Sequence, residues 1–89
     1  MPKRVVITGM GAITPLGNDV DTFWEGLKQG QNGIDIIDKF DVSEYSTQMA
    51  ASVKDFDPKD FMDRKEARRM DRYTQFAMAA TNMAIEDAN

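Results

Sequence analysis

The stretch VVITGMGAITPLG, residues 5–17, has the composition of a phosphate-binding loop, because three glycines follow a branched apolar run. A dinucleotide-binding GxGxxG that begins at Gly9 needs a third glycine where Thr14 stands. A P-loop needs a lysine directly after its last glycine, but residues 4–27 contain no lysine. Pro15 also removes a backbone donor from the segment that would hold the phosphate. The spacing therefore predicts a turn and no nucleotide site.

A second group with chemical potential is the run RKEARRMDR, residues 64–72, which holds five of the eleven basic residues. Five basic and two acidic side chains give this run a charge of +3, so the rest of the chain carries −7 toward a total of −4. On a helix that turns about 100° per residue, the basic side chains fall within an arc of roughly 140°. They are Arg64, Lys65, Arg68, Arg69 and Arg72.

Two interpretations of this basic face are open. The face can be solvated and neutralised by Asp63, Glu66 and Asp71, or it can bind an anionic partner. Nucleic acid is the weaker candidate, because the rest of the chain is acidic and would repel phosphates. An acidic protein surface is the better match.

The composition excludes several kinds of active site. The chain has no cysteine and no histidine, so it offers no thiol nucleophile, no imidazole base and neither of these metal ligands. No apolar run reaches the roughly 18 residues of a membrane span, and the run near the N-terminus is too short for a signal-peptide core. We therefore expect no cofactor, no metal, no nucleic-acid or membrane partner, and a cytoplasmic location.

Local patterns in the first third of the chain predict one strand and one helix. Arg4 to Thr8 contains a continuous branched run, which is typical of a strand buried on both faces. Asn18 is the expected N-cap of a helix that ends at Gly30. The apolar residues of this helix fall at i, i+3, i+4 and i+7: Val20, Phe23, Trp24 and Leu27.

The middle of the chain, residues 31–48, sustains no period, so we expect an ordered connection with a short strand at Ile34 to Ile37. Met49 to Val53 is the next expected strand. Asp57-Pro58 is typical of the cap and first position of a helical turn.

The last segment, residues 73–88, has apolar residues at helical spacing on more than one side. Met78 and Ile85 lie away from the centre of its main stripe. A helix of this kind is normally packed between two layers, and 89 residues supply little to form both. We therefore expect that part of its covering surface lies outside these residues.

Together, the segments RVVITGMGAITPLGN, FWEGLKQGQNGI, KDFDP and KEARRMDRYTQFAMAA resemble the start of a β-ketoacyl-acyl-carrier-protein synthase, most closely its synthase II branch. The resemblance covers essentially the whole chain but only the first part of a family several-fold longer. It implies an α/β fold, the N-terminal part of a thiolase-like layered α-β-α-β-α arrangement, with residues 1–89 an incomplete synthase domain. The glycine-rich stretch is then the exit of a core strand.

The resemblance also implies a chemistry, a decarboxylative Claisen condensation that depends on a cysteine and two histidines. This chain has neither residue type, so no catalytic residue is carried over. The positions that do match the family pattern are those that bind acyl carrier protein: Lys65, Arg68 and Arg69, with Arg64 and Arg72 as auxiliaries. The expected partners are acyl- and malonyl-loaded carrier protein and, for the complete enzyme, a second copy of itself. Two alternatives stay open: a polyketide-type ketosynthase or chain-length-factor homologue, and a non-catalytic module that binds an acidic protein.

Overall fold

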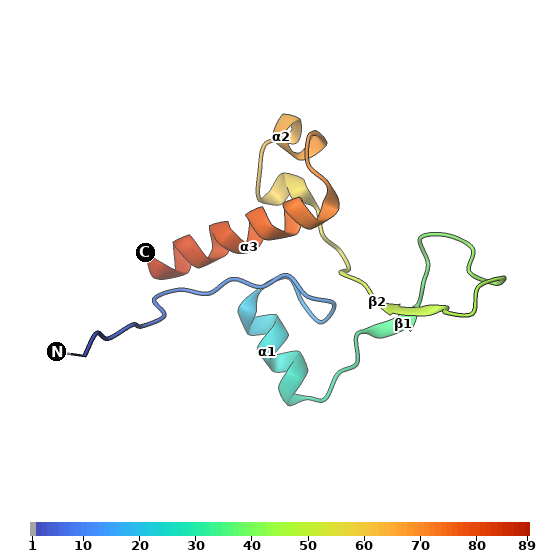
Figure 1. Ribbon diagram of the computed structural model, residues 1–89, viewed down its shortest axis with the longest axis horizontal. Helices are drawn as coiled ribbons and strands as arrows, with labels where there is room; N and C mark the ends of the chain where they lie inside the picture. Colours follow the sequence, from blue (N-terminus) through green and yellow to red (C-terminus); the bar gives the residue numbers. More distant parts are fainter. Residues whose placement is uncertain (1) are drawn as a thin grey trace. The chain divides into compact units, whose positions relative to one another are not determined.

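The computed structural model describes residues 2–89, which divide into two compact units (Figure 1). One unit comprises residues 2–12 and 57–89, and the other comprises residues 13–56. In chain order the elements are α1 (Val20–Lys28), β1 (Ile34–Ile36), β2 (Met49–Ala51), the 3-10 helix η1 (Pro58–Asp60), α2 (Arg64–Arg68) and α3 (Arg72–Ala88). No helix in this described range combines the length and the apolarity that a membrane crossing requires.

Helix α1 is present where the sequence predicts it. Its N-cap is Asp19, so the prediction of Asn18 as the cap is wrong. The Asp19 carboxylate accepts hydrogen bonds from the backbone N–H of Thr22 at 2.7 Å and from the Thr22 hydroxyl at 3.0 Å. These two bonds lower the pKa of Asp19. Asn18 instead donates its side-chain amide to the carbonyl of Lys54 at 2.9 Å. Gly30 follows the helix with φ of 71°, a conformation that favours glycine.

Strands β1 and β2 form an antiparallel pair in which Ile34 lies opposite Ala51 and Ile36 lies opposite Met49. Both strands lie at predicted positions, although each is only three residues long and ends earlier than expected. Ile36 is 65% exposed, so this ribbon has little apolar cover within the chain.

The glycine-rich stretch contains a tight turn at its end, in the unit of residues 13–56. Thr14 and Gly17 exchange backbone hydrogen bonds of 2.9 and 3.2 Å. The Thr14 hydroxyl accepts the N–H of Leu16 at 3.2 Å. Pro15 occupies the first central position, for which its fixed φ is suited. The backbone donors of the turn are thus used inside it, as the predicted turn requires.

The two earlier glycines have a different role, in the other unit. Residues 9–11 run beside the C-terminal half of α3, and the residues before them continue past the end of that helix (Figure 1). A Cβ at Gly9 would collide with the carbonyl oxygen of Ala84, and a Cβ at Gly11 would collide with that of Ala80. Glycine is required at both positions because the segment packs backbone against backbone on the helix.

The predicted strand at Arg4 to Thr8 is wrong for this chain, since these residues are extended but belong to no β-ladder. A strand needs a neighbour, and none of the described residues pairs with this segment. Val5 and Ile7 are 92% and 81% exposed. Two residues after this segment, the Met10 N–H donates to the Asp87 carboxylate at 3.0 Å.

The core of the described chain is small. The buried apolar residues are Val42, Phe56, Ala67 and Ala79, of which only Ala79 is fully buried, at 0% exposure. Helix α3 keeps Tyr73 73% exposed and Ile85 64% exposed, so it has apolar surface on more than one side, as its sequence predicts.

Candidate functional site

Four of the basic residues lie on α2 and on Arg69, the residue that ends it. Arg64 and Arg68 are one helical turn apart, and Lys65 and Arg69 form a second row beside them. Arg69 has φ of −91° and ψ of −1°, so it continues the helical turn as the C-cap. All four side chains are exposed. We refer to these four residues as the basic surface.

Hydrogen bonds from α3 hold α2, and with it the basic surface, in position. Ala67 is the buried residue of α2, and its carbonyl accepts a hydrogen bond from the Gln75 side chain at 2.9 Å. The side-chain amide of Asn82 donates to the carbonyl of Phe61, in the segment before α2, at 3.2 Å. Because both donors come from α3, the long helix sets the orientation of α2 and the cations it carries.

The prediction of one continuous helix over residues 64–72 is wrong. Helix α2 stops at Arg68 and α3 begins at Arg72, with Asp71 in an extended conformation between them, at φ −68° and ψ 161°. Asp71 is the N-cap residue of α3 by its backbone conformation, although its side chain makes no capping hydrogen bond, so a new helix starts where the pattern suggested a continuing one. Arg72 therefore belongs to α3, where its guanidinium lies over the Phe76 ring at 5.2 Å from the centroid.

Among the described residues, the cations of the basic surface form no ion pair with their acidic neighbours. Within residues 2–89, none of its four cations forms an ion pair with Asp63, Glu66 or Asp71. Lys28 and Glu25 on α1, by contrast, do pair at 2.6 Å. In this structure four cationic side chains thus project into solvent without a carboxylate partner, which the solvated and neutralised interpretation did not predict.

The structure also brings one basic residue to the site that the sequence pattern did not single out. Lys59 is on η1, which packs against α2, and it lines a hollow together with Arg64 and Arg68. The Asp57-Pro58 signal correctly predicts η1, with Asp57 accepting the Lys59 N–H at 3.0 Å. The Asp57-Pro58 sequence predicts the turn, but it does not predict that the turn packs against α2.

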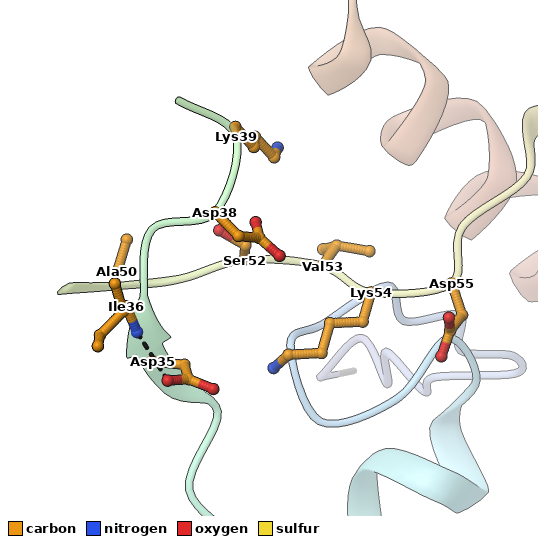
Figure 2. Close-up of a pocket in the computed structure, with 9 residues that line it drawn as sticks. All are labelled: Asp35, Ile36, Asp38, Lys39, Ala50, Ser52, Val53, Lys54 and Asp55. Atoms are coloured by element: carbon orange, nitrogen blue, oxygen red, sulfur yellow. Dashed lines mark hydrogen bonds between the residues drawn. The ribbon is translucent and has the colours of Figure 1, made fainter. Parts of the chain in front are cut away.

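A larger hollow of about 410 Å³ lies in the unit of residues 13–56, between β1, β2 and the segments that follow them (Figure 2). Its charged groups are mixed in sign: Asp35, Asp38 and Asp55 with Lys39 and Lys54. The carboxylate of Asp35 is turned back to the backbone, since the N–H of Ile36 donates to it at 2.7 Å (Figure 2). Among residues 2–89 no group of three or more possible ligands is arranged to hold a metal ion. Ser52 also lines this hollow, but among the described residues no hydrogen bond joins its hydroxyl to a carboxylate or an amine, and we assign the hollow no chemistry.

Known proteins match this chain along nearly its whole length. The family described as "Beta-ketoacyl synthase, N-terminal domain" matches residues 2–89. A Synechocystis protein named 3-oxoacyl-(acyl-carrier-protein) synthase 2 is 54% identical over 86 residues, 97% of this chain. A Staphylococcus aureus strain COL protein of the same name is 55% identical over 86 residues. This chain spans 21% of the length of each of these relatives.

A solved structure gives the same result for the fold. The structure titled "The ishigamide ketosynthase/chain length factor" superposes with a TM-score of 0.84 at 35% sequence identity. The superposition covers 93% of this chain and 21% of that chain.

Proposed function

Because the chain belongs to the β-ketoacyl synthase family, we propose that it is the first part of a 3-oxoacyl-acyl-carrier-protein synthase. The observation that carries the proposal is the high identity to two synthases of that name along nearly the whole chain. The expected fold class, α/β and part of a thiolase-like fold, is confirmed by the family and by the ketosynthase structure. The complete protein would then be an acyltransferase of fatty-acid elongation.

The proposed reaction proceeds in two stages. An acyl group first passes from its carrier thioester to a cysteine thiolate. Malonyl carrier protein then loses carbon dioxide, and the resulting carbanion attacks the acyl thioester carbonyl and expels the thiolate, which leaves 3-oxoacyl carrier protein. Family members use two histidines for decarboxylation and for stabilising the oxyanion. This chain has no cysteine or histidine, so we propose that these groups belong to the rest of the complete protein.

The proposed role of this chain at its surface is to bind acyl carrier protein through Lys65, Arg68 and Arg69. Three observations support this role. The three side chains are exposed, they share adjacent rows on α2, and within residues 2–89 they have no ion-pair partner. Exposed cations of this kind favour encounter with an acidic surface and weaken binding of a basic one.

The contacts that attach α2 to α3 also support binding. The Gln75 hydrogen bond to the Ala67 carbonyl and the burial of Ala67 hold α2 against α3. A cation on a fixed helix loses less conformational freedom on binding than one on a mobile loop. Arg64 is on the same surface and is proposed as an auxiliary binding residue. Arg72 is on the next helix, α3, so we expect it to contribute less to binding.

The alternatives are distinguished by the rest of the complete protein. A polyketide-type ketosynthase or chain-length-factor homologue is less favoured, because identity to the ishigamide structure is 35% against 54% for the Synechocystis synthase. A non-catalytic module that binds an acidic protein would lack the cysteine and histidines altogether. A homodimer and a cytoplasmic location are further parts of our proposal, and both come from the resemblance to the family.

The proposed function is tested by incubating the complete protein with an acyl carrier protein thioester and malonyl carrier protein. We expect release of carbon dioxide and formation of the 3-oxoacyl product, detected by mass spectrometry. The isolated 89-residue chain, as the matched control, should give neither. No product from a folded complete protein with either fatty-acid or polyketide acyl groups would contradict the proposed activity.

A further inference from the structure

A hollow beside the basic surface has apolar walls and a mainly cationic rim. It lies between η1 and α2, has a volume of about 250 Å³ and is open to solvent. Pro58 and the buried Ala67 contribute apolar atoms to its wall, and Gln75 of α3 also lines it. This volume is below the about 300 to 1,000 Å³ typical of small-molecule pockets, so its size suits one side chain of a partner.

The rim of the hollow is mainly cationic. Lys59, Arg64 and Arg68 line it with one carboxylate, that of Asp57. Asp57 is already engaged as the cap of η1, where it accepts the Lys59 N–H. Among residues 2–89 none of the three cations forms an ion pair, so they are available to carboxylates of a partner. An apolar wall under a cationic rim is complementary to an apolar side chain flanked by acids.

We propose that this hollow receives one apolar side chain from the acidic surface of the carrier protein, and that Lys59 and Arg64 bind the carboxylates beside it. The inference rests on the proposed function, because it takes the same partner and enlarges its binding surface. It adds Lys59, which lies outside the run of residues 64–72, and it gives Arg64 a specific role. The contact would fix the register of the partner on α2, which exposed charges alone define poorly.

The first test reverses the two rim charges in the complete protein. Each reversal removes an attraction and adds a repulsion of similar size, so we expect the double variant Lys59→Glu with Arg64→Glu to raise the Kd for apo-acyl carrier protein about 5-fold to several-hundred-fold. Lys39→Glu with Lys54→Glu is the matched control, because it changes the net charge equally at two exposed lysines of the other unit. We expect less than a twofold change for the control. Turnover of a small acyl thioester should be unchanged in both.

The second test fills the hollow without changing charge. Ala67→Leu keeps a good helix former on α2 and enlarges the buried side chain that lines the hollow. We expect carrier binding to weaken severalfold while turnover of the small thioester persists. If this variant does not fold, the rim variants decide the result.

The outcomes separate this inference from the proposed function. Carrier binding by the wild type that is unaffected by the Lys59 and Arg64 reversals, but lost on reversal of Lys65 and Arg69, overturns the role of the hollow and leaves the carrier site in place. Equal weakening by the rim variant and the control means a general charge effect and also overturns it. If the wild type does not bind carrier protein at all, both proposals fall.

Discussion

Reversal of the charge at Arg69 is the sharpest perturbation of the proposed carrier-binding surface. Arg69 is exposed, ends α2 and lies one turn from Lys65. Glutamate can adopt the same helical backbone conformation, so Arg69→Glu changes the charge with little change in shape. We expect this variant to weaken carrier binding while the complete protein stays folded.

The magnitude follows from the exposure of the site. An exposed ion pair contributes about 0.2 to 1 kcal/mol. Reversal removes this attraction and adds a repulsion of similar size, so the loss is about 0.4 to 2 kcal/mol, or about 2- to 30-fold in Kd. Lys65 and Arg68 remain, so binding should be weakened and not abolished. Reversal at the C-terminus of a helix also removes a favourable dipole interaction of about 0.3 to 1 kcal/mol and adds an unfavourable one, so the Tm of the variant is measured beside its Kd.

The assay compares kcat/KM for a carrier-bound acyl thioester and for a small acyl thioester that does not use the carrier surface. Arg69→Glu should lower the first value and leave the second unchanged, and Arg69→Gln should lie between it and the wild type. Since exposed charges are screened over about 8 Å at physiological salt, the wild-type affinity should fall as salt rises, and the variant should respond less.

Arg72→Glu is the matched control for this series. It makes the same change in charge three residues away, but on α3 and over the Phe76 ring. Its effect on carrier binding should be smaller, because the break at Asp71 separates Arg72 from the basic surface. Equal losses of carrier-bound and small-thioester activity in Arg69→Glu would mean that Arg69 supports the fold or the active site, and the reasoning would be refuted.

Three further predictions concern the local structure. Gly11→Ala should lower the Tm of the complete protein strongly, by a loss of about 1 to 3 kcal/mol or more, because its Cβ would collide with the Ala80 carbonyl; an unchanged Tm would exclude the close packing. Asp19→Ala should cost about 1 kcal/mol and speed amide exchange in α1, because it removes the bonds to Thr22. Those bonds lower the pKa of Asp19, so the stability that its carboxylate gives to the protein is fully present above pH 3.8, the ordinary pKa. This stability is lost as the pH falls through the lowered pKa of the folded protein, and amide exchange rates in α1 that do not rise in acid would contradict this. Asp55 has φ of 57°, a left-handed conformation that favours glycine, so Asp55→Gly should stabilise the protein by about 1 kcal/mol and raise its Tm. Asp55→Val should lower the Tm, because a branched side chain disfavours this conformation.

Most helices could be predicted from the sequence because their signals are local. The apolar spacing after residue 19, the Asp57-Pro58 cap and the terminal apolar stripe all depend on residues within a few positions of each other. The strand at Arg4 to Thr8 could not be predicted correctly in the same way, because a strand requires a partner and its sequence pattern does not identify one. The glycines Gly9 and Gly11 likewise acquire their meaning only from α3, far along the chain.

The candidate site was predicted in part. The proximity of Lys65, Arg68 and Arg69 follows from helical spacing and is present in the structure. The extension of this face to Arg72 failed, because charge spacing alone does not reveal that Asp71 begins a second helix. Lys59 was missed for a further reason, since its position beside Arg64 depends on how η1 packs on α2.

The packing of residues 9–11 on α3 has a consequence for how the chain is made on the ribosome. Met10 and its anchor Asp87 are 77 positions apart. At about 5 to 20 residues per second, the ribosome needs about 4 to 15 s to synthesise that interval. During this time the branched apolar run that includes Val5 and Ile7 has been synthesised while the helix that fixes its end is still missing. A nascent chain of this kind is a good client for a ribosome-associated chaperone, and synonymous codons that change the speed of translation before α3 should change the yield of folded protein without altering a single residue.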